Sequence, residues 1–124
     1  QVLILDEPTA GLDPKGRDRI LGQIREYHQE KQSTVMLVSH SMEDVAKHAT
    51  KILVMNKAKI FCYDEPPKVF RKADEISQMG LAVPQITRVF NALRQKGYDI
   101  AEDVYTVDYA KKKFLQYLQN KEGK

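Results

Sequence analysis

The sequence predicts an α/β fold in which a parallel βαβ unit and a β-hairpin precede a small helical domain. Two short apolar runs, at residues 2–5 and 34–38, flank a long amphipathic segment, a pattern typical of parallel strands joined by a helix. Two further strand patterns, at residues 51–55 and 59–63, lie close enough together to form a hairpin. Beyond about residue 72 only helical patterns remain.

The composition is that of a globular protein. The 124 residues include 20 Lys and Arg against 17 Asp and Glu, a net charge of +3, which excludes a strongly basic nucleic-acid arm or an acidic tail as the main feature. The single cysteine excludes an internal disulfide and a multi-cysteine zinc site. No apolar run approaches the roughly 20 residues of a membrane-spanning helix.

An apolar run and two helix-start residues predict the first strand and the helix that follows it. The continuous apolar run at residues 2–5 predicts a strand that is buried on both faces, as in a parallel sheet. Asp13 is a good N-cap residue, and Pro14 suits the first helical position. The helix is predicted from about residue 15 to residue 31, with one apolar face made of Ile20, Leu21, Ile24 and Tyr27.

Capping and turn residues predict the elements that follow the second strand. Ser41 and Asp44 form a capping box that starts a short helix. The hairpin is expected to turn through a three-residue loop, 56–58, with Ala58 at positive φ, where glycine is more comfortable. Pro66 then starts another short helix.

The remaining residues predict two helices and a domain boundary. The first carries its apolar residues at helical spacing and ends at Gly97, and Thr106 caps the second. We therefore expect one domain at residues 1–71 and a helical domain at residues 72–124. The apolar positions of the two helices are Ile86, Val89, Phe90 and Leu93, then Val107, Ala110, Phe114, Tyr117 and Leu118.

Two adjacent acids follow the first strand and give the clearest functional signal. Asp6 and Glu7 emerge at the carboxyl end of that strand, the edge where open α/β sheets bind their ligands. Adjacent carboxylates repel unless a positive group stands nearby, and a magnesium–phosphate complex would supply one. Two acids after an apolar run are, taken alone, more often a solvated strand end.

The wider context of these acids resembles the ABC-type ATPases. Residues 6–14, Asp-Glu-Pro-Thr-Ala-Gly-Leu-Asp-Pro, resemble their Walker B and D-loop sequence. Ser39-His40, directly after the next strand, resembles their switch histidine. The fold that this implies is the C-terminal half of a P-loop NTPase.

The resemblance implies a role for four residues. Asp6 would orient Mg²⁺ through water, and Glu7 would act as general base for the attacking water. His40 would sense the γ-phosphate of ATP. Asp13 would reach across the dimer that encloses the nucleotide, although it is also a good N-cap and can serve both purposes.

The tail of the chain narrows the resemblance to one family. Residues 81–87, with a Leu-x-x-Pro-x-x-Thr pattern, residues 93–97 and residues 105–107 resemble the C-terminal extension of energy-coupling factor transporter ATPases, which drive uptake of vitamins or of cobalt and nickel ions. This implies ATP and Mg²⁺ as cofactors, and as partners a second ATPase subunit, identical or different, and integral membrane subunits. It also implies a location on the cytoplasmic face of the membrane, no nucleic-acid partner and no direct membrane insertion. In that family the tail helps to pair the ATPase subunits.

Some of the family's motifs are missing, which leaves alternatives open. No G-x-x-x-x-G-K-[ST] phosphate loop, Gln loop or signature sequence is present. We therefore expect the C-terminal half of a longer subunit, inactive by itself. The alternatives are an ABC ATPase of another transporter family or of the DNA-repair type, and a non-catalytic module that pairs subunits through its tail.

Overall fold

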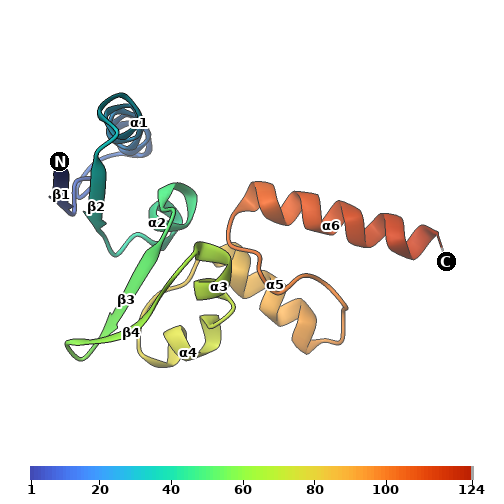
Figure 1. Ribbon diagram of the computed structural model, residues 1–124. Helices are drawn as coiled ribbons and strands as arrows, with labels where there is room; N and C mark the ends of the chain where they lie inside the picture. The colour runs from blue at the N-terminus through green and yellow to red at the C-terminus, as the bar shows by residue number, and fades with distance from the viewer. Residues whose placement is uncertain (124) are drawn as a thin grey trace. The chain divides into compact units, whose positions relative to one another are not determined.

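The computed structural model describes residues 1–123, which divide into two compact units (Figure 1). The first unit is Gln1–Ser41, and the second begins at Met42. The sequence suggested a division near residue 72 because strand patterns stop before it. The last strand in the described residues ends earlier, at Asp64. The division into a domain at residues 1–71 and a helical domain at residues 72–124 stays a prediction.

The first unit is a parallel βαβ unit, as predicted. Strands β1 (Val2–Asp6) and β2 (Thr34–Val38) pair in parallel, with Leu3 opposite Val35. Helix α1 (Pro14–Lys31) connects them. The carboxyl ends of both strands therefore lie at one edge of this sheet.

Local signals explain where α1 begins. The Asp13 carboxylate accepts a hydrogen bond of 2.8 Å from the backbone N–H of Gly16, and Pro14 occupies the first turn. A Cβ atom on Gly16 would lie 2.8 Å from the same carboxylate oxygen, so this tight cap requires glycine there. The predicted N-cap role of Asp13 is confirmed.

The prediction that the first strand is buried on both faces is wrong for this chain. Burial alternates along both strands of the pair. The half-covered residues share one face because strand side chains alternate, while Val2, Ile4, Met36 and Val38 on the other face are 48% to 65% exposed. A sheet of two strands with one connecting helix lacks the second layer that buries both faces of a parallel sheet.

In the described residues, the second unit consists of a hairpin and five helices. Its main core joins α2 to the hairpin and to the next two helices, through side chains such as Val45, Val54, Phe70 and Ile76. A helix that the sequence patterns did not reveal, α4, contributes to this core. In chain order the elements are α2 (Met42–His48), β3 (Ile52–Asn56), β4 (Lys59–Asp64), α3 (Pro66–Phe70), α4 (Ala73–Gln78), α5 (Gln85–Gln95) and α6 (Val107–Glu122).

The hairpin turn is shorter than the sequence suggested. Asn56 pairs with Lys59, so the loop has two residues and not three. Both loop residues, Lys57 and Ala58, have positive φ, 49° and 59°, as a type I′ turn requires. The expected positive φ of Ala58 is thus confirmed. Farther from the turn, the strand register shifts between Val54 and Met55, as at a β-bulge.

Ala58→Gly should stabilise the fold by about 1 kcal/mol, because the left-handed region costs alanine more than it costs glycine. The expected readout is a melting temperature about 2 °C higher in a subunit of ordinary domain size. Ala92→Gly is the matched control: Ala92 is exposed within α5, and glycine there should destabilise by about 1 kcal/mol. A lower melting temperature for Ala58→Gly would contradict the observed turn geometry.

The tail helices are held by a second, smaller core. Thr87 in α5 is 1% exposed, and its hydroxyl donates a 2.8 Å hydrogen bond to the Val104 carbonyl. Phe90 and Ala110 pack in the same core, and Thr106 caps α6 through the backbone N–H of Tyr109. The predicted helix with its Gly97 end and the predicted Thr106 cap are both confirmed.

Most of α6 extends beyond this core (Figure 1). Ala110, in the first turns, is 4% exposed, whereas Phe114, Leu115 and Leu118 are 43%, 50% and 40% exposed. A solvent-facing apolar stripe of this kind is typical of a surface that another element covers.

Candidate functional site

The two strands of the first unit end in the polar residues that the sequence singled out. Asp6 is the last residue of β1, and Glu7 follows it. The backbone N–H of Glu7 donates a 2.8 Å hydrogen bond to the Val38 carbonyl, which continues the strand pairing by one residue. His40 lies two residues beyond the end of β2, at the same sheet edge.

The structure brings Glu7 and His40 together. The Oε1 atom of Glu7 accepts two hydrogen bonds from His40, one from the ring Nδ1 at 2.8 Å and one from the backbone N–H at 3.0 Å. An ionised carboxylate only accepts, so Nδ1 carries the proton and Nε2 is left to contact another group. The histidine ring is 86% exposed and the Glu7 side chain 32% exposed, so both remain accessible.

The backbone of Glu7 is strained. Its φ is 47°, in the left-handed region that a residue with a side chain seldom occupies. The Val38 carbonyl holds its N–H, and its own carbonyl accepts from the N–H of Ala10 at 3.1 Å. Such conformations cost about 1–3 kcal/mol and cluster at functional sites, where neighbouring hydrogen bonds enforce them. No sequence pattern predicts this strain.

A serine turn positions His40. The hydroxyl of Ser39 accepts a 3.0 Å hydrogen bond from the backbone N–H of Ser41, which closes the turn around the histidine. In the sequence, Ser39 stands out only as part of the Ser-His pair. Serine hydroxyls commonly bond the backbone two residues on, and this habit is the signal that would have revealed the turn.

The other two predicted site residues lie on the same connection. Asp6 is exposed at the end of β1. Asp13 uses Oδ1 for the α1 cap, and its second predicted role, across a dimer, stays a prediction. Among residues 1–123 no group of three or more His, Cys, Asp or Glu side chains could hold a metal ion. No helix in that range is long and apolar enough to span a membrane.

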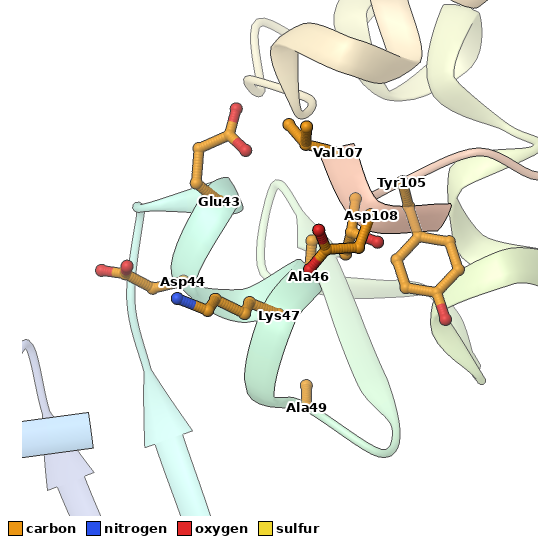
Figure 2. Close-up of a pocket in the computed structure, with 9 residues that line it drawn as sticks. Glu43, Asp44, Ala46, Lys47, Ala49, Tyr105, Val107 and Asp108 are labelled. Atoms are coloured by element: carbon orange, nitrogen blue, oxygen red, sulfur yellow. The ribbon is translucent and has the colours of Figure 1, made fainter. Parts of the chain in front are cut away.

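A separate hollow lies in the second unit (Figure 2). It has a volume of about 560 Å³ and is lined by α2 and by the start of α6, including Glu43, Lys47, Tyr105 and Asp108. The Glu43 carboxylate is engaged: its Oε1 accepts a 2.8 Å hydrogen bond from the backbone N–H of Gln85. No role for Glu43 was predicted from the sequence beyond its place in the short helix.

Comparison with known proteins gives a consistent set of relatives. The energy-coupling factor transporter ATP-binding protein EcfA2 of Clostridium tetani is 54% identical over 121 residues, covering 98% of this chain and 42% of the relative. The protein of the same name from Clostridium acetobutylicum is 50% identical, with 97% and 42% covered, and that from Listeria monocytogenes is 41% identical, with 95% and 41% covered. No protein-family profile matches.

A similar fold is found among solved structures. One of them is cbiO1 from Clostridium perfringens, described as part of the ABC transporter complex cbiONQ. It is 32% identical with a TM-score of 0.54, and the match covers 73% of this chain and 36% of that one. The chain thus spans about two fifths of the length of the curated relatives it matches.

The fold and these likenesses define the class. A parallel βαβ unit with a hairpin and a helical tail, similar in structure to cbiO1, is the C-terminal half of a P-loop NTPase of the ABC type. Within that class, the chain belongs to the family of energy-coupling factor transporter ATP-binding proteins.

Proposed function

We propose that this chain supplies the catalytic carboxylate and the switch histidine of an ATP-binding subunit, whose ATP hydrolysis drives uptake through an energy-coupling factor transporter. The observation that carries the proposal is the pair of hydrogen bonds between Glu7 and His40 at the carboxyl edge of the parallel strands. The full-length subunit is a protein of the relatives' length that carries this sequence.

Glu7 is the general base in this proposal. Its carboxylate takes a proton from the water that attacks the γ-phosphate, while the Nδ1–H of His40 holds the carboxylate in place. The free Nε2 of the 86% exposed histidine ring then faces the nucleotide. The enforced backbone of Glu7 fixes the carboxylate before substrate arrives, and such preorganisation lowers the barrier of the chemical step.

Asp6 fits a magnesium site. Its carboxylate is exposed beside Glu7, and Mg²⁺ in nucleotide enzymes uses one or two carboxylates, several waters and phosphate oxygens. Bound with ATP, Mg²⁺ supplies charge neutralisation of the phosphates. Asp6 contributes a fixed negative charge at a rigid strand end.

The substrate and setting follow from the family. We propose a vitamin or a metal ion such as cobalt as the transported substrate, selected by integral membrane subunits at whose cytoplasmic face the ATPase works. A second ATPase subunit, identical or different, completes the nucleotide site, with Asp13 at the interface. The relatives' shared name, energy-coupling factor transporter ATP-binding protein, supports this setting.

ATP hydrolysis by the full-length subunit tests the proposal. Together with its partner subunits it should hydrolyse ATP in a magnesium-dependent manner. The 124-residue chain alone should neither bind Mg-ATP tightly nor hydrolyse it, because tight binding needs backbone N–H groups and a lysine around the phosphates. Micromolar affinity of the isolated chain for Mg-ATP, measured by calorimetry, would contradict the interpretation that the chain is only the C-terminal half of the ATP-binding subunit.

The exposed stripe on α6 is the proposed pairing surface for the second ATPase subunit. Residues 42–71 and 72–83 contribute to the same hydrophobic core. Deleting residues 72–124 would therefore disrupt that core as well as the pairing surface. Substitutions on α6 test the pairing surface without disrupting the core. Leu115→Lys with Leu118→Lys should weaken subunit pairing about 10-fold or more, because two leucines leave the interface. Subunit pairing should weaken more than ATP binding does.

Two polar positions on the same helix provide the control for this pairing test. Gln116 and Gln119 are exposed on α6, and Gln116→Lys with Gln119→Lys adds the same charge without removing apolar surface. Equal dimer affinity for both double variants, measured by analytical ultracentrifugation, would remove α6 from the pairing surface. The non-catalytic alternative predicts pairing without ATP hydrolysis.

A further inference from the structure

Glu43 caps a helix that is distant in sequence. It lies in the first turn of α2, and its Oε1 accepts the 2.8 Å hydrogen bond from the N–H of Gln85, the first residue of α5. The N-cap position of α5 is Pro84, which makes no side-chain capping bond. The first N–H groups of a helix lack partners within it, and a carboxylate there also favours the helix dipole. Glu43 supplies from another helix what the local sequence does not.

The capped helix leads on to α6. Thr87, two residues after Gln85, donates its hydroxyl to the Val104 carbonyl at 2.8 Å. Val104 is 1% exposed and stands two residues before Thr106, the N-cap of α6. The Glu43 contact therefore begins a series of fixed hydrogen bonds from α2 through α5 to the start of α6.

The same end of α2, its N-terminus, follows the candidate site directly in the chain. His40 precedes the first residue of α2 by only two positions. Its backbone N–H and its ring are both bonded to Glu7. A change of the His40 backbone that accompanies nucleotide binding would therefore occur only two residues before the helix whose first turn carries Glu43.

We propose that Glu43 is a positioning residue that couples the nucleotide state sensed at His40 to helix α5 and, through Thr87, to the start of α6. The inference rests on the proposed function, because it requires nucleotide at the Glu7–His40 site. Coupling of this kind needs rigid elements joined by specific contacts. The carboxylate-to-backbone bond is one such contact, and removing it should uncouple α5 while leaving Glu7 and His40 intact.

Hydrogen–deuterium exchange on the full-length subunit with its partners, with and without Mg-ATP, tests the proposal. In the unmodified protein, Mg-ATP should change exchange both around residues 6–7 and 40 and in residues 85–90. Glu43→Ala should speed exchange at residues 85–90 about fivefold, as expected for one lost cap, and should abolish the ATP-dependent change there. Glu43→Gln, which keeps the acceptor oxygen, should retain the ATP-dependent change at residues 85–90.

Asp108→Ala is the matched control, because Asp108 places a carboxylate on the same hollow (Figure 2). It should leave the ATP response of residues 85–90 unchanged. A purely structural role for Glu43 predicts faster exchange by the same factor with and without ATP, and that outcome would overturn the coupling. An ATP response at residues 6–7 and 40 without one at 85–90 in the unmodified protein would overturn only this inference, whereas no response anywhere would overturn the proposed function as well.

Discussion

Replacing Glu7 by glutamine is expected to slow ATP hydrolysis by the full-length subunit about 100- to 10,000-fold, the usual contribution of a positioned general base. The amide has nearly the shape of the carboxylate, and its oxygen can still accept from the His40 N–H, now 3.0 Å from Oε1. It cannot take a proton from water. Glutamine tolerates the φ of 47° no worse than glutamate does, so the backbone should remain in place.

ATP affinity should be unchanged in Glu7→Gln, because the substitution leaves Asp6 and the strand end as they are. The measurements are steady-state hydrolysis and equilibrium nucleotide binding on the same preparation. Glu26→Gln, at an exposed position of α1, is the matched control and should hydrolyse ATP at the original rate. A Glu7→Gln variant with that same rate would take the catalytic role away from Glu7.

The parts of the fold that the sequence predicted well are those decided by neighbouring residues. The Asp13 cap, the Thr106 cap and the Gly97 helix end each depend on interactions within a few positions, which is why local patterns revealed them. The parallel pairing of β1 and β2 followed from the length of the helix between them.

The parts that were missed depend on contacts between distant residues or on small differences in energy. Glu43 and Gln85 are 42 positions apart, and no local pattern announces that one caps the other. The hairpin loop was expected to have three residues because its strand ends are read only to within a residue or two, and Asn56 proved to be paired. Burial on both faces of β1 requires other elements packed on both sides of the sheet, and the sequence of the strand does not show whether they are present.

The candidate site shows both kinds of result. The strand ends and the parallel connection predicted that Glu7 and His40 would lie at one edge, and they are in contact at 2.8 Å. The left-handed backbone of Glu7 was not foreseen, because glutamate gives no conformational signal for it. Backbone strain that surrounding hydrogen bonds impose cannot be predicted from the local sequence. Such strain is found most often at functional sites.

Replacing His40 by alanine is expected to reduce hydrolysis about 100-fold or more, because it removes both the Nδ1–H donor that holds Glu7 and the Nε2 atom that we propose contacts the nucleotide. The backbone N–H of residue 40 remains, so the 3.0 Å bond to Glu7 should survive and keep the loop folded. His28→Ala is the control: His28 lies on α1 and bonds the Ser33 carbonyl, so its loss should affect stability and not turnover.

The double variant Glu7→Gln with His40→Ala distinguishes one catalytic unit from two independent residues. When two residues act as one catalytic unit, removing either one already removes most of the unit's contribution to the rate. The rate losses of the two single variants therefore do not multiply in the double variant. Because Glu7 and His40 share a direct hydrogen bond, the double variant should hydrolyse ATP no more slowly than the slower single variant. Rates that fall by the product of the two single effects would show that the histidine works without the carboxylate, and the 2.8 Å contact would then have no part in catalysis.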